Sequence, residues 1–306
     1  MGENRARNEG AVLLALLAVF WGANWPAMKL AVLELGPWTF RVICVYVGAV
    51  GLFALALAKR LPLGLPRGRE GFFALTAILN IAIWQVTSAY GLKFMAAGRA
   101  VLVAFTMPIW AAVFGALFAG ERFTLRKSLA LALGVTGLGL LALPAGDTLA
   151  NSTAGLLLML AAAVGWAAGT VTLKAQRFEM SAVTLTAWQL AIAGLPLVAG
   201  MVWFEVLGGE GAMLPRGTMS LPGFLGAAYA STVPMIFCHW AWFRTLEILP
   251  ASVASIGTLA VPVVGVLSSS WLLGEPLGWH EALAMACVVA ALALALIAPR
   301  SRGAAA

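Results

Sequence analysis

The sequence predicts an all-α membrane protein in which ten transmembrane helices form two inverted five-helix repeats around a central cavity. Composition is the first reason, because 62% of the residues are hydrophobic and only 10% are charged, whereas a soluble domain is usually about one quarter charged. The second reason is a series of apolar segments of about 20 residues, the length that crosses a ~30 Å hydrocarbon core as a helix. The third is that one half of the chain resembles the other.

The apolar segments can be placed with little freedom of choice. The ten predicted spans are residues 11–33, 38–58, 71–92, 96–119, 128–143, 152–173, 181–207, 221–243, 249–273 and 280–298. The alternating pattern of a membrane barrel is absent, so helices must satisfy the backbone hydrogen bonds within the bilayer.

The internal repeat divides the chain at residues 144–151, a polar joint between the copies 11–143 and 152–298. Leu92, Ala97, Ala100, Pro108, Gly120 and Glu121 recur 154 residues later as Leu246, Ala251, Ala254, Pro262, Gly274 and Glu275. At the front of each copy, Trp21, Lys29 and Thr39 recur 145 residues later as Trp166, Lys174 and Thr184. Because each copy holds an odd number of spans, the second enters the membrane from the opposite side, an arrangement typical of alternating-access transporters.

The net charge of +7 follows the pattern of a membrane protein and not that of a nucleic-acid-binding protein. Fourteen of the Lys and Arg residues fall on the same side of the membrane as the N-terminus, and five fall on the other side. Because basic residues collect on the cytoplasmic side, this asymmetry predicts that both termini are cytoplasmic. It also explains the positive charge without a nucleic-acid partner, which is excluded. The first apolar segment is longer than a signal-peptide core, so we expect it to be retained. Cys44, Cys238 and Cys287 lie inside predicted helices and indicate neither a disulfide framework nor a metal site.

The duplicated pattern of a leucine, two spaced alanines, a mid-helix proline and a terminal Gly-Glu step resembles the EamA domain of the drug/metabolite transporter superfamily. The resemblance covers nearly the whole chain. Within that superfamily, the tryptophan-rich helices resemble the bacterial aromatic amino-acid exporters of the YddG type. The resemblance implies that helices one to four and six to nine surround a cavity, with helices five and ten outside. The fifth and tenth segments agree, because they contain almost no polar residue between their ends.

Several function classes are excluded by what the spans lack. None of the twelve acidic residues falls in the middle of a predicted span, so a proton or cation site built on a buried carboxylate has no candidate. No zinc-binding, nucleophile-elbow or phosphate-loop motif is present. We therefore expect no catalytic residue, no metal and no cofactor, and the protein is not expected to be an enzyme.

The first span carries a candidate substrate-binding face. Trp21, Asn24, Trp25 and Met28 are spaced as one side of a helix. Because a bare amide is costly in lipid, Asn24 should turn this face toward the bundle interior. Pro26 frees a backbone carbonyl and is a candidate kink. A purely structural role for Asn24 and core packing of the tryptophans is the alternative.

The third span repeats this arrangement with Asn80, Trp84, Thr87 and Gly91, and Gln85 lies beside them. The repeat sets Gln85 opposite His239, the one histidine inside a predicted helix. His239 is either a ligand contact or an interhelical hydrogen-bonding partner. It is also the one buried group expected to titrate near neutrality.

The fourth and ninth spans carry matched prolines, Pro108 and Pro262, which either expose carbonyls to a cavity or only kink the helices for packing. The remaining candidate substrate contacts are spread over these spans and the sixth. They are Met107, Trp110, Ser255, Thr258, Trp166 and Thr170.

A pocket with aromatic walls, amides and hydroxyls suits a neutral or zwitterionic molecule with a flat apolar part. The cations near span ends, Lys29, Arg41, Lys93, Arg99 and Lys174, are expected to snorkel to the interface. We expect a bacterial inner-membrane exporter of aromatic and other apolar or neutral amino acids that works by alternating access down the substrate gradient. Its partners are then a small-molecule substrate and the lipid bilayer, and it is a monomer or a weak dimer. A broad drug/metabolite exporter, an intramembrane enzyme of lipid chemistry and a structural scaffold are the alternatives.

Overall fold

The structure is a computed structural model that describes residues 2–65, 67–118, 124–143, 149–176, 178–208, 219–249, 253–254 and 257–296. Over these ranges the regular structure is helical. Eight helical spans are long and apolar enough to cross a membrane, and two shorter apolar helices follow, Ala260–Leu273 and Trp279–Ala295. The predicted all-α membrane class is therefore confirmed.

The first five predicted spans correspond to seven α-helices and one π-helical segment. These are α1 (Gly2–Leu35), α2 (Pro37–Ala58), α3 (Glu70–Ala77), η1 (Ile78–Ala82), α4 (Ile83–Phe94), α5 (Ala97–Ala104), α6 (Met107–Phe118) and α7 (Leu125–Ala142). The helix α7 begins earlier than predicted because the hydroxyl of Thr124 caps it by accepting from the N–H of Lys127.

The remaining predicted spans contain two further π-helical segments. The elements are α8 (Leu149–Gln176), α9 (Ala182–Gly200), η2 (Met201–Leu207), α10 (Leu221–Thr232), η3 (Val233–Cys238), α11 (His239–Ile248), α13 (Ala260–Leu273) and α14 (Trp279–Leu296). Since α8 begins at Leu149, the polar joint predicted at 144–151 is too long: its last three residues are helical. Its other residues, 144–148, lie outside the described ranges.

Side-chain caps and one glycine define several helix starts. Ser181 and Ser220 accept hydrogen bonds from the N–H groups of Thr184 and Gly223, each at 3.1 Å, which satisfies donors that a helix start leaves free. Gly36 joins α1 to α2 with φ 79°. This backbone conformation suits glycine, and a Cβ there would lie 2.6 Å from Oε1 of Glu205.

Three long spans are interrupted near their middle. The π-helical segments η1 and η3 lie in the third and eighth spans, at positions about 154 residues apart. In the fourth span a turn at Phe105 and Thr106 separates α5 from α6. Interruptions of this kind change which side chains face a neighbouring helix, and they recur at functional sites.

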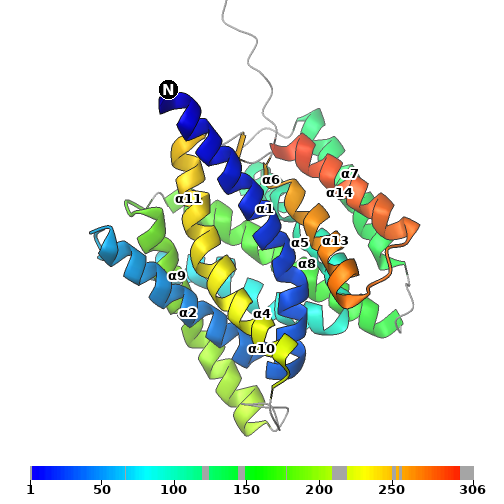
Figure 1. Cartoon of the computed structure of the whole chain (residues 1–306), viewed down its shortest axis with the longest axis horizontal. Coiled ribbons are helices and arrows are strands. Elements are labelled where there is room, and N and C mark those ends of the chain that lie inside the picture. The colour runs from blue at the N-terminus through cyan, green and yellow to red at the C-terminus, as the bar shows by residue number, and fades with distance from the viewer. Residues whose placement is uncertain are drawn as a thin grey trace, which may run out of the picture.

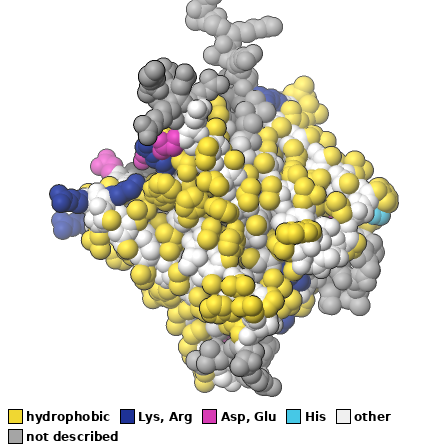
Figure 2. Space-filling model, in the orientation of Figure 1, with side chains coloured by type: hydrophobic (Ala, Val, Ile, Leu, Met, Phe, Trp, Pro, Cys, Tyr) yellow, Lys and Arg dark blue, Asp and Glu magenta, His cyan; other side chains and the backbone are white. Residues whose placement is uncertain are grey.

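The helices pack mainly across the two halves of the chain. The helix α1 lies against α13 and α10, α4 against α8, α2 against α9, α5 against α13, and α7 against α14, as Figure 1 shows with α7 and α14 together at one edge. Two glycines of α7 allow close packing: Gly137 lies against Val288 and Ala284 of α14 in the other half, and Gly134 against Ile109 of α6 in the same half. Hydrophobic side chains cover most of the face in Figure 2, and the charged side chains visible there lie toward its margins, as expected for a surface in contact with lipid.

One end of the bundle gathers helix termini from both halves, and we call it the Glu275 end. It includes the α1–α2 and α4–α5 connections, the start of α10 and the α13–α14 connection. Side chains join these segments: Glu34 bonds Ser220, Glu205 bonds Trp38, and Glu275 bonds Ala97.

Candidate functional site

An aromatic pair joins α1 to α4 in the bundle interior. The ring centroids of Trp25 and Trp84 are 6.5 Å apart, and the ring planes meet at 85°. Trp25 is buried, and Trp84 packs against the same hydrophobic cluster. This edge-to-face geometry is a favoured arrangement of aromatic rings. The pair therefore places two of the predicted tryptophans in one contact.

Two buried amides are the sequence neighbours of this aromatic pair. Asn24 precedes Trp25 and is 8% exposed, and Gln85 follows Trp84 and is 2% exposed. The side-chain oxygens of both residues are buried and accept no hydrogen bond, although buried polar atoms are normally satisfied. Each oxygen can therefore accept a hydrogen bond from a ligand. Because the oxygen of Gln85 has no partner, it is not hydrogen-bonded to His239.

Arg41 of α2 is the functional candidate that the sequence reasoning missed. Its side chain is buried, at 1% exposure, and its guanidinium contacts α1 and α4. Nη1 lies 3.4 Å from the sulfur of Met28, and Nη2 donates to the hydroxyl of Ser88 at 2.9 Å. The guanidinium carbon also lies 4.9 Å from the centroid of the Phe40 ring. In the described part of the chain, no carboxylate forms an ion pair with Arg41.

The expectation that Arg41 snorkels to the interface is therefore wrong. Its position in the second turn of α2 is near a helix end, as predicted, but α1 and α4 cover it. Met28 stands seven residues before the end of α1, so the guanidinium lies roughly 10 Å below that end at helical rise. Burial of a cation without a carboxylate costs several kcal/mol, which makes such residues functional candidates.

The other cations near span ends divide into two groups. Lys93 and Lys174 are exposed, as predicted. Lys29 instead donates to the backbone carbonyls of Leu92 and Met95, and Arg99 is buried at 4% exposure. The interface role predicted for Lys29 and Arg99 is therefore replaced by contacts between helices.

Asn80 bridges the third and sixth spans. Its Nδ2 donates to the carbonyl of Trp166 and to the hydroxyl of Thr170, each at 3.0 Å, and Thr170 donates in turn to the Trp166 carbonyl. A Cβ at Gly169 would lie 2.6 Å from the backbone nitrogen of Asn80, so only a glycine permits this approach. In this conformation both amide hydrogens of Asn80 are used between helices.

The predicted single face of the third span is divided. Asn80 faces α8, whereas the Trp84 ring reaches Trp25 of α1, and the Thr87 hydroxyl donates to the carbonyl of Ile83 in its own helix. The physical reason is η1, whose wider turn shifts the helical register between Asn80 and Trp84. The face of the first span divides too, because Trp21 contacts Trp242 of α11 at a centroid distance of 6.0 Å.

The matched prolines stand beside the ends of interrupted helices. Pro108 is the second residue of α6, directly after the turn at Thr106, and Pro262 is the third residue of α13 and is buried. Pro26 lies inside α1 and is buried.

Side chains near these breaks are partly used within their own segments. The Thr106 hydroxyl accepts from the indole N–H of Trp110 at 3.2 Å. Met107 and Thr258 are partly exposed. Ser255 lies outside the described residues.

His239 begins α11, and its main contact is local. Its Nδ1 lies 2.9 Å from the carbonyl oxygen of Pro234 in η3. The ring also lies 6.4 Å from that of Phe243 in the same helix. Both contacts lie within the span that contains His239, so they show neither a hydrogen bond to another span nor a ligand contact.

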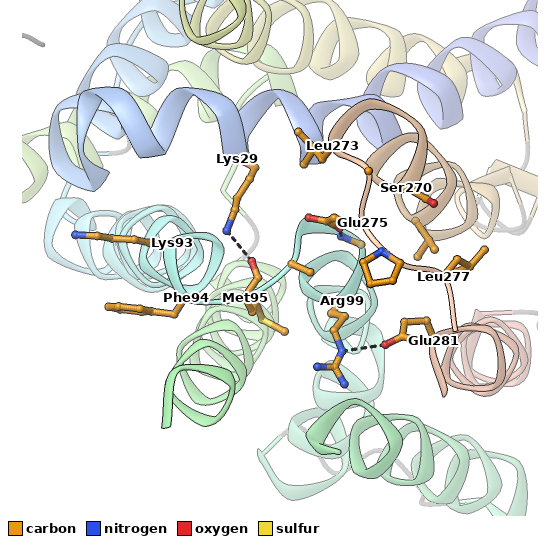
Figure 3. A pocket seen from close by; sticks show the side chains of 15 residues that line it. Lys29, Lys93, Phe94, Met95, Arg99, Ser270, Leu273, Glu275, Leu277 and Glu281 are labelled. Carbon is orange, nitrogen blue, oxygen red and sulfur yellow. Dashed lines mark hydrogen bonds and ion pairs between the residues drawn. The ribbon is translucent and has the colours of Figure 1, made fainter. Parts of the chain in front are cut away.

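A pocket of about 420 Å³ opens at the Glu275 end, between α1, the α4–α5 connection and the α13–α14 connection. Figure 3 shows Lys29, Lys93 and Arg99 on its walls together with Glu275 and Glu281. Both signs of charge therefore line this opening.

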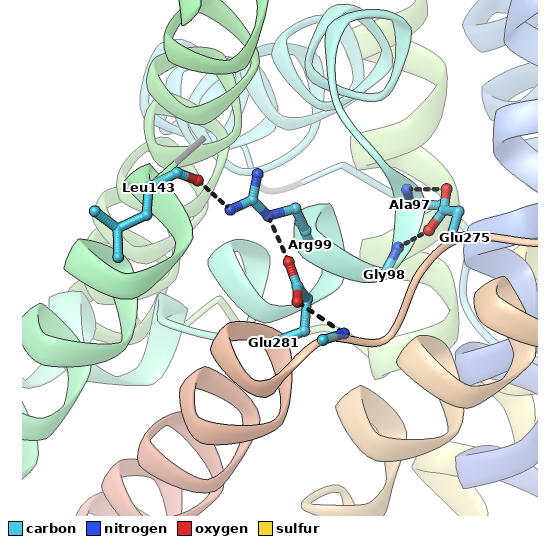
Figure 4. Close-up of polar contacts among 7 residues, drawn as sticks. Ala97, Gly98, Arg99, Leu143, Glu275 and Glu281 are labelled. Carbon is cyan, nitrogen blue, oxygen red and sulfur yellow. Dashed lines mark hydrogen bonds and ion pairs between the residues drawn. The ribbon is translucent and has the colours of Figure 1, made fainter. Parts of the chain in front are cut away.

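Two carboxylates of this region, Glu275 and Glu281, bind the start of α5 and its surroundings, as Figure 4 shows. Glu275 accepts from the backbone N–H groups of Ala97 and Gly98 at 2.7 and 2.8 Å. Arg99 pairs with Glu281 at 3.4 Å and donates to the carbonyl of Leu143 at 2.7 Å. The start of α5 is thereby bound to α13, α14 and α7.

Several known proteins of similar sequence are named transporters or efflux pumps. The model of the EamA-like transporter family matches residues 8–143 and 153–297. The uncharacterized transporter YvbV of Bacillus subtilis is 30% identical over 87% of this chain and 85% of its own length. The probable amino-acid metabolite efflux pump of Salmonella typhimurium is 26% identical over 94% of each chain. The uncharacterized inner membrane transporter YedA of Escherichia coli is 27% identical over 92% of this chain and 88% of its own.

A solved crystal structure supports the fold. It aligns with a TM-score of 0.62 at 20% sequence identity and covers 92% of this chain and 96% of its own. The family model matches both segments that carry the duplicated proline and Gly-Glu pattern. With most of the sequence matched and the membrane helices in place, the chain belongs to the EamA-like transporter family.

Proposed function

We propose that this transporter exports aromatic and other apolar or neutral amino acids by alternating access. The observation that carries the proposal is the Trp25–Trp84 pair, whose sequence neighbours Asn24 and Gln85 have buried amide oxygens without a hydrogen-bond partner. Rings bind a flat apolar side chain, and the amides serve the polar end of the same molecule. The Salmonella relative named as a probable amino-acid metabolite efflux pump supports this substrate class.

The buried positive charge of Arg41 distinguishes an amino-acid exporter from an exporter of cationic drugs. A broad exporter of cationic drugs needs an acidic group, and Arg41 would instead repel a cation in the same part of the bundle. The relatives named as transporters favour transport over the lipid-chemistry enzyme.

Alternating access rests on the inverted repeat, with copies at 11–143 and 152–298. A twofold relation between the copies exchanges the contact of α1 and α10 with that of α8 and α3. It likewise exchanges the contact of α1 and α13 with that of α8 and α6. All four contacts are present, which supports the proposed symmetry. The breaks beside Pro108 and Pro262, and the proline kink at Pro26, are the proposed bending points.

We propose that the chain lies in the bacterial inner membrane with both termini cytoplasmic, so that the Glu275 end faces outward. The charge asymmetry supports this orientation, and the name of the inner-membrane relative YedA supports the location. The pocket at the Glu275 end is then the outer vestibule of the pathway.

The test is a substrate panel with purified protein in liposomes. Labelled tryptophan and phenylalanine should enter faster than threonine, and glutamate should enter slowest. Protein-free liposomes measure leakage. Uptake of tryptophan and phenylalanine no faster than in protein-free liposomes would overturn the proposal.

A further inference from the structure

Arg41 has more hydrogen-bonding capacity than its neighbours use. A guanidinium carries five N–H donors. The Nε of Arg41 is buried and has no partner. Nη1 is directed at the thioether of Met28, which is a weak acceptor on a flexible side chain. The strongest acceptor that it contacts is the neutral hydroxyl of Ser88.

A carboxylate would complete this arrangement. Its two oxygens match the planar fork of an arginine, and the resulting charge-assisted hydrogen bonds are stronger than those to a thioether or a hydroxyl. The ligand would also neutralise the charge that the described protein residues leave uncompensated.

The free amide oxygens lie next to Arg41 along both neighbouring helices. Asn24 is one turn before Met28 in α1, and Gln85 is one turn before Ser88 in α4. Both are displaced from the guanidinium toward the middle of the membrane by about 5 Å at helical rise. Amide oxygens accept hydrogen bonds and suit an ammonium group. The Trp25–Trp84 pair fixes α1 and α4 at this same level.

We infer that Arg41 binds the carboxylate of the transported molecule while the side-chain oxygens of Asn24 and Gln85 accept hydrogen bonds from its ammonium group. The ligand class is a zwitterion with its carboxylate and ammonium on one carbon and an apolar side chain toward Trp25 and Trp84. This inference rests on the proposed transport of amino acids and specifies how the common part of every substrate is recognised.

The first experiment uses the wild-type protein in liposomes and four related compounds. These are phenylalanine, phenylalaninamide, phenethylamine and 3-phenylpropionate. Phenylalanine should be transported. The amide and the amine should be about 10- to 100-fold slower, because a charge-assisted pair to Arg41 is lost. Excess 3-phenylpropionate should compete with phenylalanine, and excess phenethylamine should compete less.

The second experiment uses variants of one helix. Arg41→Gln should lower phenylalanine transport about 10- to 100-fold, whereas Arg41→Lys should retain part of it because the positive charge stays. Lys59→Gln removes the same charge from the exposed, opposite end of α2 and should match the wild type. Thermal unfolding and gel filtration of each variant show whether it folds. If Arg41→Gln does not fold, the analogue series still decides.

The outcomes separate this inference from the proposed function. If phenylalanine and phenylalaninamide are transported equally, the carboxylate site is wrong and amino-acid transport stands. If no amino acid is transported, the proposed function fails, and ligand-induced thermal stabilisation decides the site. Stabilisation by 3-phenylpropionate but not by phenethylamine, weaker in Arg41→Lys and lost in Arg41→Gln, would support it. Equal stabilisation by both compounds, or by neither, would overturn it.

Discussion

Glu275 holds the first backbone N–H of α5, that of Ala97, at 2.7 Å, although 178 residues separate the two in sequence. The same carboxylate accepts from the next N–H, that of Gly98, at 2.8 Å. A carboxylate at a helix N-terminus satisfies free donors and interacts favourably with the helix dipole. The bond also explains two parts of the duplicated pattern: the glutamate of the second copy caps the helix that begins with the first alanine of the first copy.

Replacement of this capping carboxylate should lower stability. Glu275→Ala leaves two helix-start donors without an acceptor and should cost about 1 to 2 kcal/mol. Thermal unfolding in detergent measures the loss. Glu247→Ala is the control, since Glu247 forms only an exposed ion pair with Arg244, which is worth about 0 to 1 kcal/mol. Equal melting temperatures for the two variants would show that the cap is not stabilising.

Two glycines in membrane helices should respond in opposite ways to alanine. At Gly169 a Cβ would lie 2.6 Å from backbone and side-chain atoms of Asn80, whereas at Gly139 it would meet nothing within 4 Å. Gly169→Ala should therefore separate α8 from η1, break the hydrogen bonds of Asn80 and cost about 1 to 3 kcal/mol. Gly139→Ala should be neutral or slightly stabilising. Thermal unfolding of both variants tests the pair, and a neutral Gly169→Ala would contradict the packing described.

Removal of the interior tryptophan rings should change substrate preference. Trp25→Ala and Trp84→Ala should each slow tryptophan transport several-fold more than threonine transport, because an aromatic pair contributes about 0.5 to 1.5 kcal/mol beyond its buried area. Trp271→Ala is the matched control, since Trp271 is 83% exposed. Relative rates in liposomes are the measurement. If the transport rates of tryptophan and threonine fell equally, the two rings would serve only helix packing and not substrate recognition.

The proposed orientation can be tested with single cysteines in a background without Cys44, Cys238 and Cys287. A cysteine replacing Leu277, which is 44% exposed at the Glu275 end, should react with a membrane-impermeant maleimide in intact cells. A cysteine replacing Gly64, exposed in the α2–α3 connection, should react only after the membrane is permeabilised. The reverse result would invert the topology.

Transport should not require a proton or sodium gradient. The described acidic residues lie at helix ends or in connections, so the middle of the described spans offers no carboxylate to carry a cation. Phenylalanine flux into liposomes should persist when ionophores collapse both gradients. Flux that stops with the proton gradient would identify His239 as the group to replace next, with His239→Asn compared against His280→Asn near the start of α14.

The membrane class and the helical segments could be predicted from sequence because they depend on local composition. The burial of Asn24 was also predictable, since a bare amide is costly in lipid. The helical register of the third span was not predictable, because nothing in the sequence around Asn80 marks the π-helical turn that lies between Asn80 and Trp84.

The burial of Arg41 could not be predicted from its position near a helix end. An arginine in the second turn reaches water unless neighbouring helices cover it, and Met28 and Ser88 become its neighbours only in the folded bundle. The same holds for Asn80 and Thr170, whose pairing across 90 residues leaves no local pattern. Sequence reasoning thus found most of the polar groups but not their partners.

The carboxylates at the Glu275 end constrain the order of folding during synthesis. Glu34 bonds the N–H of Ser220 across 186 residues, and Trp38 bonds Glu205 across 167, so the first contact waits for the start of the eighth span and the second for the end of the seventh. The bond from Ala97 to Glu275 waits longer still. Until then the starts of α2 and α5 have no acceptor from the chain, and the early helices must remain near the interfacial water or the insertion machinery. Release of the finished bundle into lipid is therefore tied to the arrival of its last two helices.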